Sequence, residues 1–186
     1  MRTRLNVLLA SSRSVAGMFD HGESRLSDII NSPLQSVIRL TDATLGRLGN
    51  EHANEPVEVA VVPKSQVVLV FATHELTRPA DRRISSFVAK RTTGLIVLVG
   101  GLRVRGQAHA TFALDPVELQ RLVADRESRF VVLTDARLAL DVEGTTEREV
   151  GVVMVNAQHI QFVARDLMAE QTAKDTESQA IAFAAE

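Results

Sequence analysis

Leu40–Leu45, with the sequence LTDATL, recurs at Leu133–Leu138 as LTDARL, so five of the six positions are identical. Three further blocks recur in the same order around these segments, which is typical of an internal duplication. The matched blocks are Ser14–Gly17 with Arg103–Gly106, Val59–Val62 with Val150–Val153, and Ser65–Val68 with Ala157–Ile160. The sequence therefore predicts two tandem copies, at residues 1–73 and 92–166. A linker at 74–91 joins them, and a polar tail at 167–186, which we expect to be disordered, follows.

Each copy has the pattern of two strands, a short helix and three further strands. Gly100 and Gly101 predict a tight hairpin between the first two strands of copy two, because glycine accepts positive φ at no cost. Asp115, followed by Pro116 and by Glu118 three residues after the cap, predicts a helix start there. Ser27 is the expected helix cap of copy one. The remaining strands are expected at 36–40, 57–62 and 67–72, and at 129–133, 150–155 and 159–164.

Five short strands and one helix per copy favour a small, strongly bent β-barrel over an open sheet, because closure removes exposed strand edges. The predicted fold class is therefore mainly β with short helices, built as two tandem small barrels of the order β-β-α-β-β-β. The apolar residues at alternate strand positions give the expected core. In copy one these are Val7, Leu9, Val15, Phe19, Leu26, Ile30, Val37, Leu40, Val59, Val61, Val68 and Val70.

The composition excludes several classes of function. The 186 residues include no Cys, which rules out disulfides, thiolate metal sites and cysteine catalysis. Neither Trp nor Tyr is present, and the formal net charge is −2, so neither a base-stacking platform nor a strong field for polyanions is expected. The longest apolar run, Gly94–Leu102, is far shorter than a membrane span needs. We therefore expect a cytoplasmic protein that does not enter the membrane.

Four segments of copy one together resemble the Sm-like (LSm) barrel family. They are Asn6–Leu9, Ser14–Asp20, Val37–Ala43 and Val59–Val68. The family has Gly and then Phe-Asp in its first two strands, a third strand that ends in a Leu-x-Asp-Ala-like segment, and a tight turn between strands four and five. The resemblance implies two tandem Sm-like barrels, each with its helix inserted at a variable loop. It also implies RNA binding and ring assembly.

The residues through which Sm-like proteins contact RNA have few counterparts in this chain. The family's base-contacting Asn lies in a loop that has become the helix here, with Asn31 at its end. The turns before the fifth strands read Pro63–Ser65 and Asn156–Gln158, so they lack the family's Arg-Gly pair. Only Lys64 matches the Tyr-Lys-His of the bacterial RNA chaperone branch. The resemblance therefore supports the fold and self-association more than RNA recognition.

A second resemblance is to an uncharacterised bacterial domain family with an Arg-Leu-Ser-Asp-x-x-Asn segment and a Leu-Thr-Asp-Ala motif. Arg25–Asn31 and Leu40–Ala43 carry it in copy one, and copy two keeps the motif at Leu133–Ala136. This resemblance implies no activity.

No arrangement of residues in the sequence indicates catalysis, a metal or a cofactor. The candidate carboxylates Asp42 and Asp135 follow Thr41 and Thr134 at the same place in both copies, without a neighbouring base or ligand set. We interpret all four as a structural motif in which the side chains bond local backbone N–H groups at a turn or bulge. His21 and His109 fall near the ends of the second strands. We expect them to be solvated, with a meeting at a copy–copy interface as the alternative.

The linker carries the one basic cluster: Arg78, Arg82, Arg83, Lys90 and Arg91. Its functional interpretation is a contact for a polyanion or an acidic partner. Its structural interpretation is a solvated connector.

Five consecutive apolar residues form the fifth strand of copy one: Val67, Val68, Leu69, Val70 and Phe71. A run without polar alternation must be covered on both faces. We expect it to be an assembly edge buried against copy two or, slightly favoured, against another chain. The fifth strand of copy two is interrupted by His159 and Gln161, so that edge is expected to lie closer to water.

These features predict a non-catalytic scaffold or adaptor that acts by self-association and partner binding. The expected partners are a second copy of the chain, giving a homo-oligomer, or another protein. The alternatives are an RNA-binding tandem Sm-like protein and a small-ligand sensor that uses the groove between the copies. No cofactor and no metal are expected.

Overall fold

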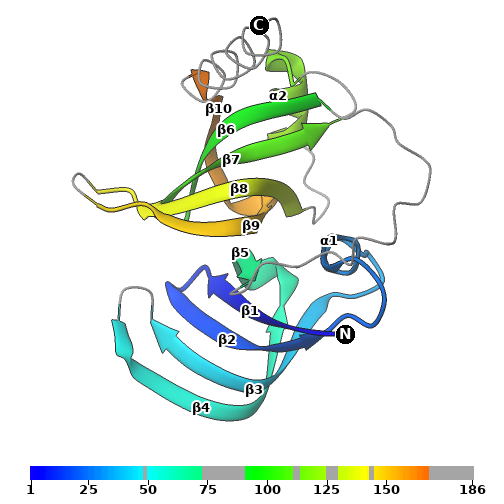
Figure 1. The fold of residues 1–186 in the computed structure, drawn as a ribbon, viewed down its shortest axis with the longest axis vertical. Coiled ribbons are helices and arrows are strands. Elements are labelled where there is room, and N and C mark those ends of the chain that lie inside the picture. The colour runs from blue at the N-terminus through cyan, green and yellow to red at the C-terminus, as the bar shows by residue number, and fades with distance from the viewer. Residues whose placement is uncertain (48–49, 73–90, 111–113, 125–129, 143–144, 168–186) are drawn as a thin grey trace, which may run out of the picture.

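The computed structural model describes residues 1–47, 50–72, 91–110, 114–124, 130–142 and 145–167 (Figure 1). The first half contains β1 (Arg2–Leu9), β2 (Arg13–Asp20), α1 (Leu26–Ile30), β3 (Val37–Arg47), β4 (Asn50–Pro63), the 3-10 turn η1 (Lys64–Gln66) and β5 (Val67–Ala72). The second half contains β6 (Arg91–Val99), β7 (Leu102–Ala110), α2 (Pro116–Ala124), β8 (Phe130–Leu140), β9 (Arg148–Asn156), the 3-10 turn η2 (Ala157–His159) and β10 (Ile160–Arg165). Both halves thus have the same order of elements.

All the strands belong to one antiparallel sheet in the order β10-β6-β7-β8-β9-β5-β1-β2-β3-β4. Figure 1 shows the strands of the second half curving above those of the first, with β5 and β9 adjacent between them. The mainly β class is confirmed. The sheet is not closed, however, so the prediction of two tandem barrels is not confirmed. The two strongly bent halves share one sheet.

The link between the halves is a short antiparallel pairing of β5 with β9, which we call the inner joint. Its register places Leu69 opposite Val155, Val70 opposite Met154 and Phe71 opposite Val153. The other edge of β5 pairs with β1. Both faces and both edges of β5 are therefore covered, which explains why five apolar residues can follow one another there.

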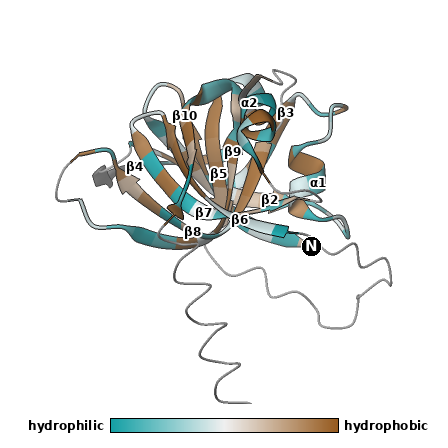
Figure 2. Cartoon of the chain, turned by 90° about the horizontal axis from the view of Figure 1, so that it is seen from above, coloured by the Kyte–Doolittle hydropathy of each residue, from teal (hydrophilic) through white to brown (hydrophobic). Residues whose placement is uncertain are grey.

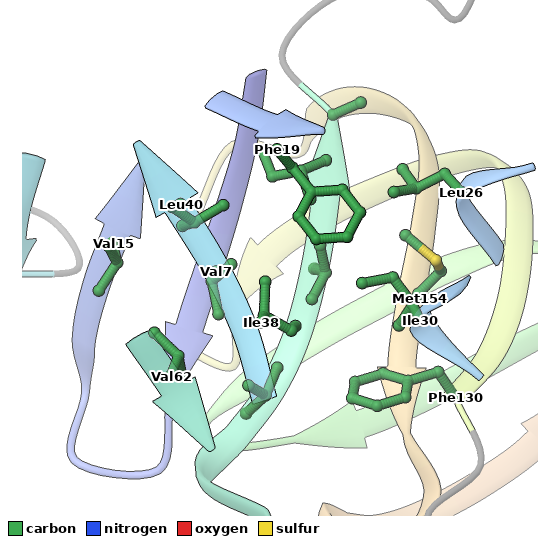
Figure 3. Close-up of a cluster of buried hydrophobic side chains, with 14 of the residues drawn as sticks. Val7, Val15, Phe19, Leu26, Ile30, Ile38, Leu40, Val62, Phe130 and Met154 are labelled. Carbon is green, nitrogen blue, oxygen red and sulfur yellow. The ribbon is translucent and has the colours of Figure 1, made fainter. Parts of the chain in front are cut away.

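Two hydrophobic clusters form the core, and each takes residues from both halves. Around Val7 and Ile30 of the first half pack Phe130 and Met154 of the second (Figure 3). The other cluster lies in the second half and includes Leu8, Val68 and Leu69 of the first. Seen along the long axis, β5 and β9 lie near the centre and are hydrophobic over most of their length (Figure 2). The core therefore continues across the inner joint.

The prediction that Val37, Val59 and Val61 lie in the core is wrong, because all three are exposed. The reason is the phase of β4, in which Val62 points inward and its odd-numbered neighbours point outward. A run of valines does not define which alternate residues face the core. Val37 lies opposite Pro63 at the outer end of the same strand pair.

The strands that carry the Leu-Thr-Asp-Ala motif run on through it, which corrects the expectation that they end there. Asp42 and Asp135 adopt φ of 48° and 49° inside β3 and β8, where the strand register shifts. The motif is therefore a β-bulge. Gly17 and Gly106 face the two bulges, and a Cβ added to either would lie 3.0 Å from the nearest atoms of the motif strand. This close approach explains why both copies carry a glycine there.

The predicted turns and caps are confirmed in the second half. Gly100 and Gly101 have positive φ of 56° and 77° in the hairpin between β6 and β7. The Asp115 carboxylate accepts from the backbone N–H groups of Val117 and Glu118, at 2.8 and 2.9 Å. The expected cap of copy one is wrong, because α1 starts at Leu26 and its N-cap position, Arg25, makes no side-chain cap.

Candidate functional site

The bulge aspartates are placed by backbone geometry. The Thr41 hydroxyl donates to the Met18 carbonyl, and the Thr134 hydroxyl to the Gln107 carbonyl, each at 3.5 Å across to the neighbouring strand. The expectation had been bonds to local N–H groups. A shallow, open depression beside Asp42 is lined by Ala43, Thr44, Pro56, Val57 and Glu58. Its titratable side chains are the carboxylates of Asp42 and Glu58, and no histidine or lysine is among its lining residues.

The histidines lie in different settings, and His21 corrects the expectation of solvated rings. His21 is buried; its Nδ1 donates to the Ser24 carbonyl at 2.8 Å, and its Nε2 lies 3.1 Å from the Thr3 hydroxyl. His109 is exposed and contacts the Thr134 hydroxyl at 2.7 Å. The rings of His21 and His109 are thus each bonded within their own half.

The basic linker cluster lies mostly outside the described residues, which include neither Arg78, Arg82, Arg83 nor Lys90. Arg91 is the first residue of β6 and is exposed, so it belongs to the sheet. Within the described ranges, no group of three or more histidine and acidic side chains is placed to hold a metal ion. None of the helices described there is long and apolar enough to cross a membrane.

The predicted assembly edge, Val67–Phe71, lies within β5 at the inner joint. β1 and β9 of the same chain pair with its two edges, so this strand is buried within the chain. The intermolecular version, slightly favoured from the sequence, is not what is found. A second chain cannot pair with β5 unless β9 leaves it.

Polar groups from both halves stabilise the inner joint, and most of them could not be recognised from the sequence. The Asn31 side chain accepts from the backbone N–H of Phe130 at 2.6 Å and donates to its carbonyl at 3.1 Å. The buried Asn156 amide donates to the carbonyls of Lys64 and Val67 at 3.1 and 2.8 Å. His159 Nε2 lies 3.0 Å from the Ser65 carbonyl. These contacts join the halves by directional bonds as well as by apolar packing.

Lys64 is buried at the start of η1, beside α1. Its Nζ donates to the carbonyls of Ile29 and Ser32 at 3.3 and 2.9 Å, which lie at the C-terminal end of that helix. Burial lowers the pKa of Lys64 below its ordinary value. The side chain therefore ties α1 to the turn that precedes β5.

Two strand edges remain unpaired within the described part of the chain, and we call them the open edges. β4 pairs with β3 on one side, and β10 pairs with β6 on one side. Val59 and Val61 on β4 and Phe162 on β10 are exposed beside them. Sequence reasoning placed the edge of β10 closer to water, in agreement with the structure, but it did not predict that Val59 and Val61 on β4 would be exposed. The only sequence signal for the exposed face of β4 was the alternation of polar and apolar residues along the strand. Its valines, which stand at both odd and even positions, obscure that alternation.

Comparison with known proteins gives no match: no family model fits the sequence, and no curated protein or solved structure matches it significantly.

Proposed function

We propose that this chain is a non-catalytic scaffold or adaptor that self-associates and binds partners through the open edges of its sheet. The single observation that carries the proposal is that a strand pairing already joins two halves of the same element order, while β4 and β10 are left unpaired in the described residues. An exposed strand with apolar neighbours is a template for another strand. Self-association covers that surface.

The shared strand order supports a duplicated Sm-like module as the basis of this scaffold. β5-β1-β2-β3-β4 in the first half has its counterpart in β10-β6-β7-β8-β9 in the second. The bulge at Leu-Thr-Asp-Ala and the glycine that faces it also occur in both halves. We propose a cytoplasmic setting for the protein.

Light scattering coupled to size-exclusion chromatography tests the proposal. We expect the mass at 5 to 200 µM to rise above the 20.3 kDa of one chain. A constant single-chain mass over this range contradicts self-association. Fluorescence anisotropy with a labelled single-stranded RNA at two salt concentrations provides the comparison with the RNA-binding alternative. Micromolar affinity that falls steeply with salt would favour that alternative over the scaffold.

A further inference from the structure

An apolar strip crosses four strands of the second half on the face turned away from its core. Residues between the rows of this strip, such as Val97 and Val104, are fully buried in the core. Because side chains alternate between the two faces of a strand, the rows themselves lie on the outer face. The strand registers align Phe162, Leu98, Arg103 and Ala139 in one row, and Ala164, Ile96, Arg105 and Arg137 in the next. We call the apolar residues of these two rows the outer strip.

The outer strip is part of a sheet face and is distinct from the open edges. Phe162 is 51% exposed, and Leu98 and Ile96 are half-buried. No residue of the strip belongs to either hydrophobic cluster of the described residues. Its strands β10, β6 and β7 are also the farthest from the first half in the order of the sheet. Grouped apolar side chains that stay exposed in this way mark interaction surfaces.

Arg103, in the middle of the first row, has no carboxylate partner among the residues that the structure describes. In the next row, Arg105 and Arg137 form ion pairs with carboxylates at 3.3 to 3.8 Å. Arg103 instead lies between Leu98 and Ala139, and its Nε is buried without a hydrogen-bond partner. A guanidinium in apolar surroundings is stabilised when a carboxylate accepts its hydrogen bonds. The charge of this row is therefore complementary to an acidic side chain.

A partner on this face has to bind through side chains, because the backbone groups of the inner strands are already used. β6 pairs with β10 and β7, and β7 pairs with β6 and β8, so no further strand can add to them. An amphipathic helix can place apolar side chains over the strip and an acidic side chain beside Arg103. A nucleic acid would supply a phosphate to Arg103, but no aliphatic side chains to cover Leu98 and Ile96.

We propose that the outer strip binds an acidic amphipathic helix of another protein. The apolar side chains of this helix cover Leu98 and Phe162, and one of its carboxylates pairs with Arg103. The inference rests on the partner-binding part of the proposed function and names the chemical class of the partner. It uses no strand pairing, so the helix binds whether the open edges are paired or free.

A peptide-binding experiment on the full chain tests this surface. The probe is a fluorescein-labelled helical peptide with leucines at i, i+3, i+4 and i+7 and glutamates beside them; a second probe has lysine in place of each glutamate. Fluorescence anisotropy should give micromolar affinity of the wild type for the glutamate probe. Arg103→Glu should bind that probe roughly tenfold more weakly or worse, and should bind the lysine probe better than the wild type does.

Two further variants make the result specific to Arg103. Arg148→Glu is the matched control, because it alters an exposed arginine that lies opposite Leu138 of the inner face, and it should bind the glutamate probe as the wild type does. Arg103→Gln removes the charge but keeps a polar side chain of similar length, so it should fold even if Arg103→Glu does not. It should weaken binding of the glutamate probe severalfold, with the fold verified by circular dichroism.

The outcomes separate this surface from self-association. No binding of the glutamate probe by the wild type up to 1 mM, or equal affinity of the wild type and Arg103→Gln, overturns the inference. Displacement of the glutamate probe by unlabelled single-stranded RNA also overturns it, because the face would then be a nucleic-acid site. Light scattering on the same samples reports self-association independently. A single-chain wild type that binds the glutamate probe through Arg103 supports the inference while contradicting self-association, and an assembled wild type that does not bind it has the opposite meaning.

Discussion

Each copy of the Leu-Thr-Asp-Ala motif contains an aspartate in left-handed backbone, which few residues other than glycine adopt readily. Asp42 and Asp135 tolerate it because a short polar side chain costs less there than a branched one. The bulge also brings the motif strand against Gly17 or Gly106. Aspartate occurs at nearly the same φ in both halves. We therefore interpret this residue type as a requirement of the backbone conformation at the bulge.

Asp135→Val should therefore destabilise the protein by about 1–2 kcal/mol, since a β-branched residue is strained at positive φ. Asp135→Asn should change the free energy of unfolding by a few tenths of that, because Asn adopts this conformation equally well. Urea unfolding followed by far-UV circular dichroism measures both. Equal losses for Val and Asn would show that the carboxylate itself matters, contrary to the structural interpretation.

Lys64 gives the protein a dependence on alkaline pH. Burial lowers its pKa from the ordinary 10.5, so the folded protein releases this proton at lower pH than the unfolded chain does. Between the two pKa values the unfolded state holds more protons, and stability from this group rises with pH. Below the lowered pKa both states are protonated and the burial penalty is constant.

We expect the unfolding free energy of the wild type, relative to that of Lys64→Met, to increase as the pH is raised toward 10.5. Urea unfolding of both proteins at pH 7.5, 8.5, 9.5 and 10 measures the difference. The substitution also removes the bonds to Ile29 and Ser32. That loss shifts the unfolding free energy by a constant amount and does not make it increase with pH. Parallel curves would contradict the role of Lys64 burial.

At the scale of elements, the inner joint combines a short strand pairing with side-chain amides that reach across it. Asn156 is 1% exposed and supplies the donor for two buried carbonyls of the first half. Its removal leaves acceptors without that donor in a place that water reaches poorly.

Asn156→Ala should consequently lower the free energy of unfolding by about 1–3 kcal/mol. Gln161→Ala, on exposed β10, is the matched control and should change it by less than about 0.5 kcal/mol. Thermal unfolding in parallel with chemical unfolding would measure both. A loss for Asn156→Ala no greater than that of the control would mean that apolar pairing alone holds the joint.

The order of elements was predictable from the sequence, because glycine turns and the Asp115 cap are local signals. Gly100-Gly101 and Asp115 act through the backbone of their immediate neighbours. The phase of β4 was not predictable, since Val57–Val62 has valines at both odd and even positions and only its pairing with β3 decides which side is covered. Asn31 was also missed as a contact between the halves, because its partner, Phe130, is 99 residues away.

For the molecule as a whole, the shared order of elements in the two halves was predictable, but the way in which the halves share a core was not. Four matching blocks indicate two modules, and two modules are ordinarily expected to fold separately. Nothing in the blocks indicates that Phe130 and Met154 complete the core of the first half, or that Leu8 and Leu69 complete that of the second. The two halves therefore share one sheet and complete each other's hydrophobic clusters.

This organisation predicts that the full-length chain unfolds in a single transition. Differential scanning calorimetry should give equal calorimetric and van't Hoff enthalpies, the test of two-state behaviour. Two resolved transitions would show that the halves unfold independently.

The same reasoning predicts that residues 1–73 do not form a stable soluble domain by themselves. Without the second half, β5 loses β9 from one edge, and the buried side chains Leu69 and Val70 are left at an open edge. The cluster around Ile30 loses Phe130 and Met154, and burying residues of this size stabilises a fold by about 2–5 kcal/mol each. That loss is comparable to the whole stability of a small domain. Purified 1–73 should aggregate, and a dispersed NMR spectrum of monomeric 1–73 would contradict the shared core.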